Sequence, residues 1–325
     1  MKKIVLLMLT LAISLMGCIS IRPANEAGEI RRIKLPMGYI PNIQYAPFYV
    51  AVDQGYFAEE GIEIEFDYSF ETDGVALTGA GEISFAVASG EQVLLARSQG
   101  LPVVYVFAWY QQFPISVVSR AELGIASPAD LRGKTVGLPG PFGANYIGLE
   151  ALLFEGGVEA SEVKLDTLGF NQVESFVAGK SDIVVGYAAN EPIVLRAQGL
   201  DVTELRVSDY VQLVANGLVS NEATIANEPE LIRGMARALA RGIEFTIANP
   251  DEAYNVSLKF VENLKDQDKE LQMQVLNTSI EFWKAERIGY SDPQGWENMS
   301  AVMAKMGMIA APEDLSKSFT NEFAP

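Results

Sequence analysis

The sequence predicts an α/β fold, because two strand–loop–helix units stand out in its 325 residues. In the first unit, apolar residues alternate over 33–37 and again over 62–66, which is the period of a strand. A short amphipathic helix is expected between them, from Phe48 to Phe57, and Gly61 ends it. The second unit runs from Lys134 to Gly156. Apolar residues make up 49% of the chain, and a chain of this length usually forms two lobes.

The first half continues to alternate strands and helices. Residues 83–88 and 103–109 are apolar runs of strand length, and the second is rich in β-branched and aromatic residues. A helix is expected between them over Gln92–Ser98, and a further strand follows at Ile115–Ser119. This order is typical of a sheet with helical crossovers.

A second set of elements begins near Ala126, where Ser127 and Pro128 predict a helix start. The expected elements that follow are a strand at 134–137, a helix at 145–156, a strand at 163–168, a helix at 172–178 and a strand at 181–186. Residues 211–220 are apolar and are interpreted as the return to the first lobe. Helices are then predicted at 229–247, 251–261, 269–283 and 295–306, covering one face of the first lobe.

The N-terminal residues have the pattern of a secretion signal. Lys2 and Lys3 precede an apolar stretch over Ile4–Leu15, and Gly17-Cys18 follows it. The sequence thus predicts a signal peptide at 1–17 and a lipid anchor on Cys18, with residues 18–31 as a tether. An ordinary signal peptide with an incidental cysteine is the alternative. The protein is expected outside the cytoplasm, attached to the cell membrane by lipid.

Composition excludes several classes of function. The chain has no histidine and a single cysteine, which removes Ser-His-Asp and Cys-His catalysis and the usual zinc sites. Neither GxxxxGK[ST] nor GxGxxG occurs. The formal net charge is −18, which argues against binding to nucleic acid. We therefore expect no metal, no cofactor and no enzymatic activity, and we expect a monomer.

Three segments carry a resemblance to a known family. They read GYIPNIQYAPFYVAVDQGYFAEEGIEIEF from Gly38, AWYQQFP from Ala108 and GLPGPFGANYIG from Gly137. They resemble the periplasmic solute-binding proteins of the NMT1/THI5-like superfamily, and most closely its riboflavin-binding lipoproteins of ABC importers. The resemblance implies the two-lobe periplasmic-binding-protein fold (type II), in which each lobe is a mixed sheet flanked by helices and the ligand cleft lies between the lobes. Lobe I would take residues 32–120 and 213–325, and lobe II residues 121–212.

The candidate ligand-binding residues lie on loops that leave the ends of predicted strands, where ligands of α/β sheets bind. They are Tyr39, Asn42, Tyr45, Ser89, Glu91, Trp109, Tyr110, Gln111, Phe142, Tyr146, Tyr187, Asn190 and Glu191. The same loops hold Gln44, Gln112, Phe113 and Asn145, and none of them contains Lys or Arg. Because sulfonate and phosphate sites usually use Arg or Lys, the loops favour a flat, neutral or cationic ligand over an anion.

Several of these residues have a second interpretation. Tyr45 and Phe113 fit packing in the core as well as they fit a pocket, whereas Tyr39 and Trp109 fit pocket walls better. In the family, a tyrosine and a glutamate at the corresponding strand exit hold an aminopyrimidine, which implies such a role for Tyr187 and Glu191. Glu191 precedes Pro192 and also fits a residue that caps a helix.

The expected function is the capture of riboflavin for an ABC permease. Binding of a thiamine pyrimidine precursor of the formylaminopyrimidine type is the alternative. An enzyme of pyrimidine synthesis fits less well, because the fungal enzymes of the superfamily consume an active-site histidine and this chain has none. A sensory or adhesive lipoprotein is a third alternative.

Overall fold

The computed structural model describes residues 30–310 and 314–325. The predicted signal peptide, Cys18 and most of the tether lie outside the described residues. The tether was predicted to extend to residue 31, but the first strand already begins at Arg31. Within the described part, no helix combines the length and the apolar content that crossing a membrane requires.

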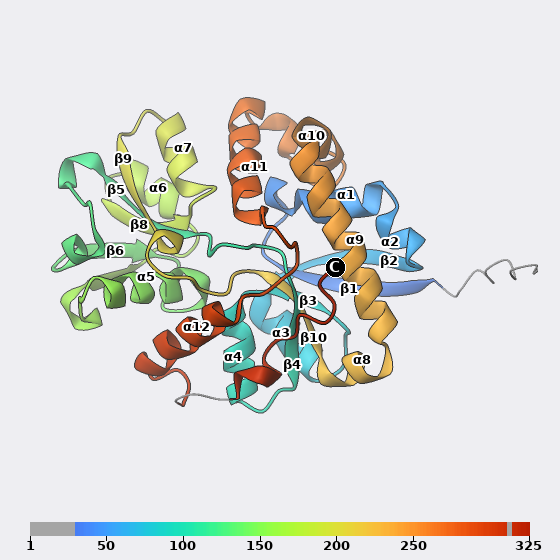
Figure 1. Cartoon of the computed structure of the whole chain (residues 1–325). Coiled ribbons are helices and arrows are strands. Elements are labelled where there is room, and N and C mark those ends of the chain that lie inside the picture. Colours follow the sequence, from blue (N-terminus) through green and yellow to red (C-terminus); the bar gives the residue numbers. More distant parts are fainter. Residues whose placement is uncertain (1–29, 311–313) are drawn as a thin grey trace, which may run out of the picture. The chain divides into compact units, whose positions relative to one another are not determined.

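One group of strands consists of four strands from the first part of the chain and one strand, β10 (Gly217–Asn221), from a later part (Figure 1). Strands β1 (Arg31–Gly38) and β2 (Ile62–Phe70) pair in parallel, and β1 lies beside β3 (Ala86–Ala88). Strand β10 pairs antiparallel with β3 on one side and with β4 (Val103–Ala108) on the other. Residues more than a hundred positions apart therefore meet in one sheet.

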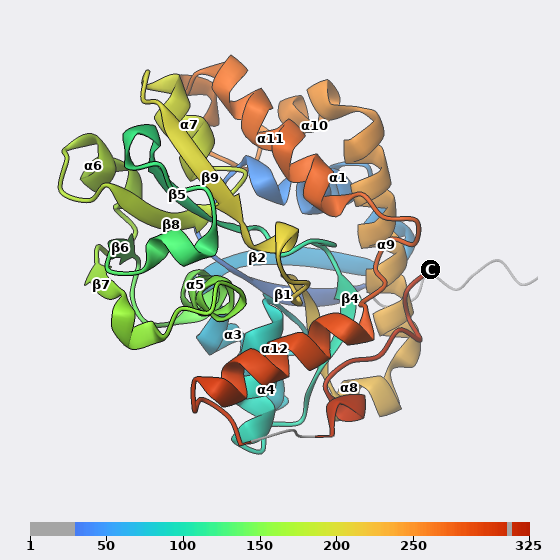
Figure 2. The ribbon, with the colours of Figure 1, turned by 60° about the vertical axis from the view of Figure 1, so that its left-hand side comes forward.

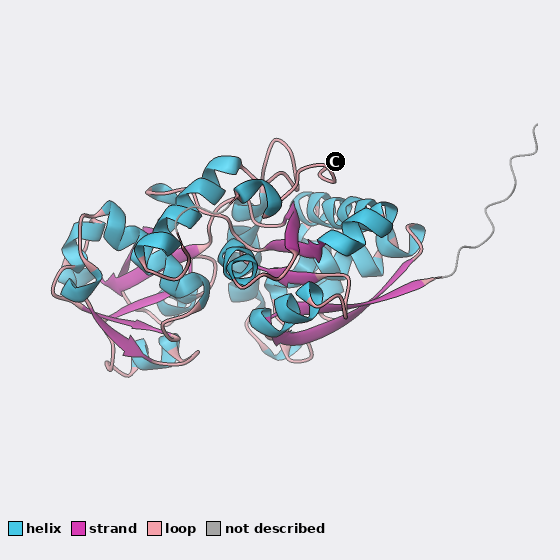
Figure 3. Ribbon diagram, turned by 90° about the horizontal axis from the view of Figure 1, so that it is seen from below, coloured by secondary structure: helices cyan, strands magenta, loops and turns pink. Residues whose placement is uncertain are grey.

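The other group is a five-stranded mixed sheet. Its order is β7 (Lys164–Thr167), β6 (Thr135–Leu138), β8 (Ile183–Tyr187), β5 (Ile115–Arg120) and β9 (Val202–Arg206). Strand β6 is parallel to β7 and β8, whereas β5 is antiparallel to β8 and β9. Figure 3 shows the two groups of strands, each flanked by helices. Strand β5 pairs only within the second group, although the predicted boundary at residue 120 assigned it to the first lobe.

Helices pack on both groups. They are α1 (Ala46–Asp53), α2 (Tyr56–Glu59), α3 (Glu71–Gly79), α4 (Gly90–Ser98), α5 (Gly143–Glu155), α6 (Gln172–Val177), α7 (Glu191–Ala197), α8 (Glu222–Asn227), α9 (Pro229–Ala248), α10 (Pro250–Ser257), α11 (Lys269–Trp283) and α12 (Pro293–Lys305). Helix α9 packs on α1, α3 packs on β1 and β3, and α5 packs on β5 and β8. Helix α12 contacts both α4 and α5, and α11 contacts α7 (Figure 2). The last helices were predicted to cover one face of the first lobe. In the structure α11 and α12 also contact α7 and α5, which belong to the second group of strands.

Local backbone chemistry explains the other differences. The helix predicted over 48–57 is divided into α1 and α2 by Gly55, whose φ of 75° only glycine adopts readily. The predicted start at Ser127 opens a short 3₁₀ turn, capped by the Asp130 carboxylate, rather than an α-helix. The strand expected at 83–88 is reduced to β3. Helices α3, α7 and α8 and strand β9 were not predicted, because their short apolar patterns are not distinctive.

The core follows the strands. Every residue of β4 is buried, and the large side chains of Phe48, Phe107 and Trp283 have lost nearly all contact with solvent. A smaller apolar cluster around Val118 and Phe176 covers the other face of the five-stranded sheet. Both sheets are thereby packed against apolar cores, and the loops at their strand ends lie outside these cores, where a site can form.

Candidate functional site: a cleft lined by aromatic rings and amides

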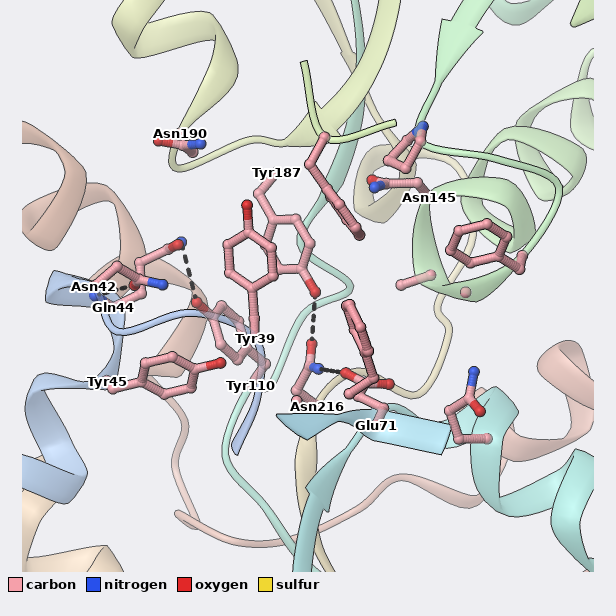
Figure 4. A pocket seen from close by; sticks show the side chains of 18 of the residues that line it. Tyr39, Asn42, Gln44, Tyr45, Glu71, Tyr110, Asn145, Tyr187, Asn190 and Asn216 are labelled. Carbon is pink, nitrogen blue, oxygen red and sulfur yellow. Dashed lines mark hydrogen bonds between the residues drawn. The ribbon is translucent and has the colours of Figure 1, made fainter. Parts of the chain in front are cut away.

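A cavity of about 500 Å³ opens where the strand ends of the two groups face each other. Its lining residues are Gly38, Tyr39, Asn42, Gln44, Tyr45, Phe70, Glu71, Thr72, Gln92, Trp109, Tyr110, Pro139, Phe142, Gly143, Ala144, Asn145, Phe170, Gln172, Tyr187, Asn190, Glu191 and Asn216. This volume lies within the range of pockets that take small organic molecules. Figure 4 shows ten of these side chains, labelled, around the cavity.

Sheet topology explains why these residues meet. The lining segments follow the carboxyl ends of β1, β2, β3, β4, β6, β7 and β8. Asn216 is different, because it precedes β10. Since β10 runs antiparallel to β3 and β4, its first residues lie at the same edge as the last residues of those strands. The two segments that cross between the groups therefore both contribute to the cleft, the first through Trp109 and Tyr110 and the second through Asn216.

A stack of buried rings forms one wall. Tyr45 and Trp109 are stacked with their ring centroids 5.5 Å apart, and Phe48 meets the Trp109 ring edge-on at 5.0 Å. The Tyr45 hydroxyl donates to the Met37 carbonyl at 2.8 Å, and burial raises the pKa of Tyr45 well above its ordinary value. Trp283 packs behind Trp109. Tyr45 and Trp109 are nearly buried and fixed by their neighbours, so they form a rigid apolar part of the wall.

Four further rings surround the mouth of the cleft, and we call them the rim rings: Tyr39, Phe70, Phe142 and Phe170. Between 39% and 59% of each side chain is exposed, which is unusual for phenylalanine. Tyr39 and Phe170 come from different groups of strands, and their centroids are 5.4 Å apart. Exposed apolar side chains that line a cavity mark a surface that a ligand covers.

A chain of hydrogen bonds runs along the polar side of the cleft (Figure 4). The Tyr187 hydroxyl donates to Asn216 Oδ1 at 3.2 Å, and Asn216 Nδ2 donates to Glu71 Oε1 at 2.8 Å. Glu71 Oε2 accepts from the Ser89 hydroxyl at 2.7 Å and from the Ser89 backbone N–H at 3.2 Å. The same Ser89 hydroxyl lies 2.5 Å from Glu91 Oε1. This chain joins the two groups of strands through the crossing segment.

The charge of the cleft is negative. None of its lining residues is Lys or Arg, and its only ionisable acids are Glu71 and Glu191. Burial raises the pKa of both carboxyls above the ordinary value, against the effect of the hydrogen bonds that each accepts. Burial, followed by the charge of Glu71, raises the pKa of Glu91 to about 7. A small anion would therefore find no cationic partner on the cleft wall.

Glu191 has a structural role as well as a place in the cleft. It is the first residue of α7, and its Oε2 accepts from the Tyr187 backbone N–H at 2.7 Å. Asn190 Nδ2 donates to its other oxygen at 3.1 Å. The carboxylate thus joins the end of β8 to the start of α7, in agreement with the helix-capping interpretation of Glu191, whereas its contact with a ligand stays a prediction.

Comparison with known proteins places the chain in a family. The family model described as "NMT1/THI5 like" matches residues 42–253. The chain belongs to the NMT1/THI5-like family. It is also 44% identical over 309 residues to the riboflavin-binding protein RibY of Chloroflexus aurantiacus, an alignment that covers 93% of this chain and 88% of the relative.

Two further similarities extend this result. A formylaminopyrimidine-binding protein of Halalkalibacterium halodurans is 31% identical over 335 residues, with 99% of this chain and 100% of the relative covered. The aliphatic sulphonate-binding protein SsuA of Escherichia coli shares the fold, with a TM-score of 0.72 at 12% identity over 89% of this chain and 92% of SsuA. The predicted periplasmic-binding-protein fold and the predicted family are both confirmed.

Nine of the thirteen site residues predicted from the sequence line the cleft. They are Tyr39, Asn42, Tyr45, Trp109, Tyr110, Phe142, Tyr187, Asn190 and Glu191. Ser89 and Glu91 are buried behind Glu71 and do not line it. Gln111 donates to the Ala108 carbonyl and lines a separate cavity of about 160 Å³. Tyr146 lies beside Glu150 on α5, outside the lining set.

The sequence prediction missed part of the cleft, above all Glu71, Phe170 and Asn216. Glu71 and Phe170 follow β2 and β7, so the strand-end rule that found Tyr39 would also have found them had those loops been considered. Asn216 precedes its strand, and the rule finds it only once β10 is known to be antiparallel. Among the described residues, no group of three potential ligands could hold a metal ion.

Proposed function

We propose that this protein is the lipid-anchored substrate-binding component of an ABC importer and that its ligand is riboflavin. One observation carries the proposal: the cleft combines stacked rings, amides and two glutamates, without a basic residue, in a chain 44% identical to a riboflavin-binding protein. Riboflavin is flat and neutral, so its ring system would stack on rim rings such as Tyr39 and Phe142, beside the rigid wall of Tyr45 and Trp109. Its ribityl hydroxyls would bond to amides such as Asn145 and Asn190.

The proposal also covers the organisation of the chain. Two lobes, joined by the segments at 109–114 and 207–216, would close on the ligand by hinge motion. Because β5 pairs within the second sheet, we place the first boundary near Pro114 rather than at residue 120. A signal peptide at 1–17 would direct export and be removed, and lipid on Cys18 would then hold the protein on the outer side of the cell membrane, beside its permease.

Calorimetric titration of the purified mature protein with riboflavin tests the ligand. We expect saturable binding at micromolar riboflavin, and a ligand at a hundredfold excess over its Kd adds about 2.7 kcal/mol to the free energy of unfolding. Flavin mononucleotide is the matched probe, because it has the same rings and adds a phosphate. The acidic cleft should bind it at least about tenfold more weakly. An absence of riboflavin binding, or an equal affinity for both flavins, contradicts the proposal.

A formylaminopyrimidine is the second candidate, supported by the relative from H. halodurans and by the position of Glu191 beside Tyr187. Titration with this pyrimidine, and no response to riboflavin, would favour it. A pyrimidine-synthesis enzyme is less well supported, because the chain contains no histidine. Loss of riboflavin uptake on deletion of the gene would separate a transport protein from a sensory or adhesive one.

A further inference from the structure

We propose that Glu71 orients the ligand by accepting a hydrogen bond from a ring imide N–H or hydroxyl, and that a proton shared between Glu91 and Ser89 keeps Glu71 ionised for this role. This inference rests on the proposed function, which supplies a ligand with such a donor. The inference names Glu71 as the residue that selects a hydrogen-bond donor on the ligand. It names Glu91 and Ser89 as the groups that keep Glu71 ionised.

The position of Glu71 favours its ionised form. It is the first residue of α3 and its side chain lines the cleft, partly exposed. Gly38, at a φ of 85°, leaves room for it, since a Cβ there would lie 2.6 Å from Glu71 Cγ. The Ser89 N–H that it accepts belongs to the N-terminus of α4. Two helix N-termini therefore favour a negative charge on this carboxylate.

The two short contacts of the Ser89 hydroxyl require a proton on one of the carboxyl groups. Ser89 Oγ lies within hydrogen-bond distance of both carboxyls, 2.7 Å from Glu71 Oε2 and 2.5 Å from Glu91 Oε1. A serine hydroxyl has one hydrogen, so it can donate to only one of the two oxygens. The other contact at this length requires a proton on a carboxyl group.

The surroundings place that proton on Glu91. Glu71 already accepts N–H donors on both of its oxygens, which stabilises the ionised form. Glu91 is 1% exposed, and its Oε2 has no hydrogen-bond partner. Its Oε1 has only a long contact of 3.4 Å from Gln92 Nε2 besides Ser89. An ionised carboxylate in this environment would carry a large desolvation cost, whereas a neutral carboxyl donates to Ser89.

No other ionisable group changes this assignment. The titratable side chains whose charges interact with the pair are Tyr45, Tyr105 and Tyr187, which reach it from the segments after β1, from β4 and from β8. Burial raises the pKa of each tyrosine, so all three remain neutral at physiological pH. No basic residue lines the cleft.

The resulting network has a single direction. Tyr187 donates to Asn216, Asn216 and Ser89 donate to Glu71, and Glu91 donates to Ser89. Three of the four acceptor positions of the Glu71 carboxylate are filled, and the remaining one is on Oε1. A ligand that meets Glu71 must therefore bring a donor. The imide N–H of an isoalloxazine ring has this chemistry, and methylation of its nitrogen removes the donor.

The test is a double-mutant cycle between protein and ligand, in which the purified mature protein is titrated with riboflavin and with N3-methylriboflavin. In the wild type, methylation should weaken binding by about ten- to a hundredfold, the range for a hydrogen bond to a charged group. Glu71→Gln should weaken riboflavin binding by a similar factor and reduce the penalty of methylation. Glu82→Gln, an exposed glutamate outside the cleft, is the matched control and should change neither.

Glu91→Gln tests the proton. The amide of glutamine donates to Ser89 as a protonated carboxyl does, so this variant should bind riboflavin within about twofold of the wild type. Loss of binding in Glu91→Gln, with an unchanged circular dichroism spectrum, would overturn the proton assignment. Equal wild-type affinities for riboflavin and N3-methylriboflavin would overturn the role of Glu71 while leaving riboflavin as the ligand. If the wild type binds no flavin, the proposed function fails and this inference falls with it.

Discussion

Among single residues, Glu91 shows how burial and one neighbouring charge act on the same carboxyl group. Its pKa is raised to about 7 from the ordinary 4.5, by burial first and by Glu71 second. Below about pH 4.5 the carboxyl is protonated in both the folded and the unfolded state, and its contribution to stability is complete. Between about pH 4.5 and 7 the unfolded chain releases the proton first, so the free energy of unfolding falls as the pH rises.

We therefore predict that Glu91→Gln removes part of the pH dependence of stability. Without ligand, the free energy of unfolding of the wild type, measured relative to that of the variant, should fall from about pH 4.5 to about pH 7 and stay level above this range. Urea unfolding at a series of pH values measures it, with Glu82→Gln as the control. Parallel profiles for wild type and Glu91→Gln would contradict the raised pKa.

Single residues also show where sequence reasoning succeeds. Tyr39 and Trp109 were predicted as pocket walls because they follow strands, and both line the cleft. Ser89 also follows a strand, but it turns into the protein as the N-cap of α4 and holds Glu91 behind the wall. Strand-end position identifies the edge on which a side chain lies. It does not specify whether that side chain points into the cleft or away from it.

Among the elements, the packing of α1 on α9 sets the position of Tyr45, because α1 begins directly after this residue. It thereby positions the wall of stacked rings that Tyr45 forms with Trp109, which we call the ring wall. Gly242 on α9 makes this contact possible. A Cβ at this position would lie 2.2 Å from the Pro47 carbonyl oxygen, which is backbone and cannot move aside alone. At Gly234, on the same helix, a Cβ would meet the side chain of Glu60 at 3.2 Å.

We predict that Gly242→Ala lowers the free energy of unfolding by roughly 1–3 kcal/mol, because the extra methyl overpacks the helix pair. Gly234→Ala is the matched control. It gains the same helix propensity, and its nearest contact would be Glu60 Cβ at 3.2 Å rather than a backbone oxygen at a much shorter distance, so its effect should be smaller by at least about 1 kcal/mol. Denaturant unfolding of both variants compares them. Equal losses would show that the contact between α1 and α9 adapts more easily than its geometry indicates.

Elements with a strong pattern were predictable, and elements defined by distant partners were not. The bounds predicted for α11, 269–283, agree with the structure, because its apolar residues recur at the helical period and Asp268 caps it. Residues 211–220 were recognised as a return crossing, but the antiparallel pairing of β10 with two strands far away in sequence has no local signal. The pairing of β5 was misjudged for the same reason.

At the scale of the whole described body, the cleft draws its walls from both groups of strands, and Tyr187 and Glu71 are linked only through Asn216 on the crossing. If the ligand binds both walls, it draws them together. We predict that riboflavin lowers the radius of gyration measured by small-angle X-ray scattering. An unchanged radius at saturating riboflavin would show that the cleft is preformed. Flavin mononucleotide at a concentration well below its own Kd is the control, because the cleft then stays mostly empty and the radius should remain near its free value.

The ring wall has one more consequence. Trp109 lines the cleft, and its ring centroid lies 6.1 Å from that of Trp283, so two of the chain's three tryptophans form a pair at the cavity. A ligand that absorbs in the near ultraviolet would accept excitation energy from both indoles, because Trp109 lines the cavity and Trp283 packs against Trp109. The intrinsic tryptophan fluorescence of the unlabelled protein thus reports how much of the cleft is occupied. The third tryptophan, Trp296, packs against Phe319 and does not line the cleft, so it contributes a background signal.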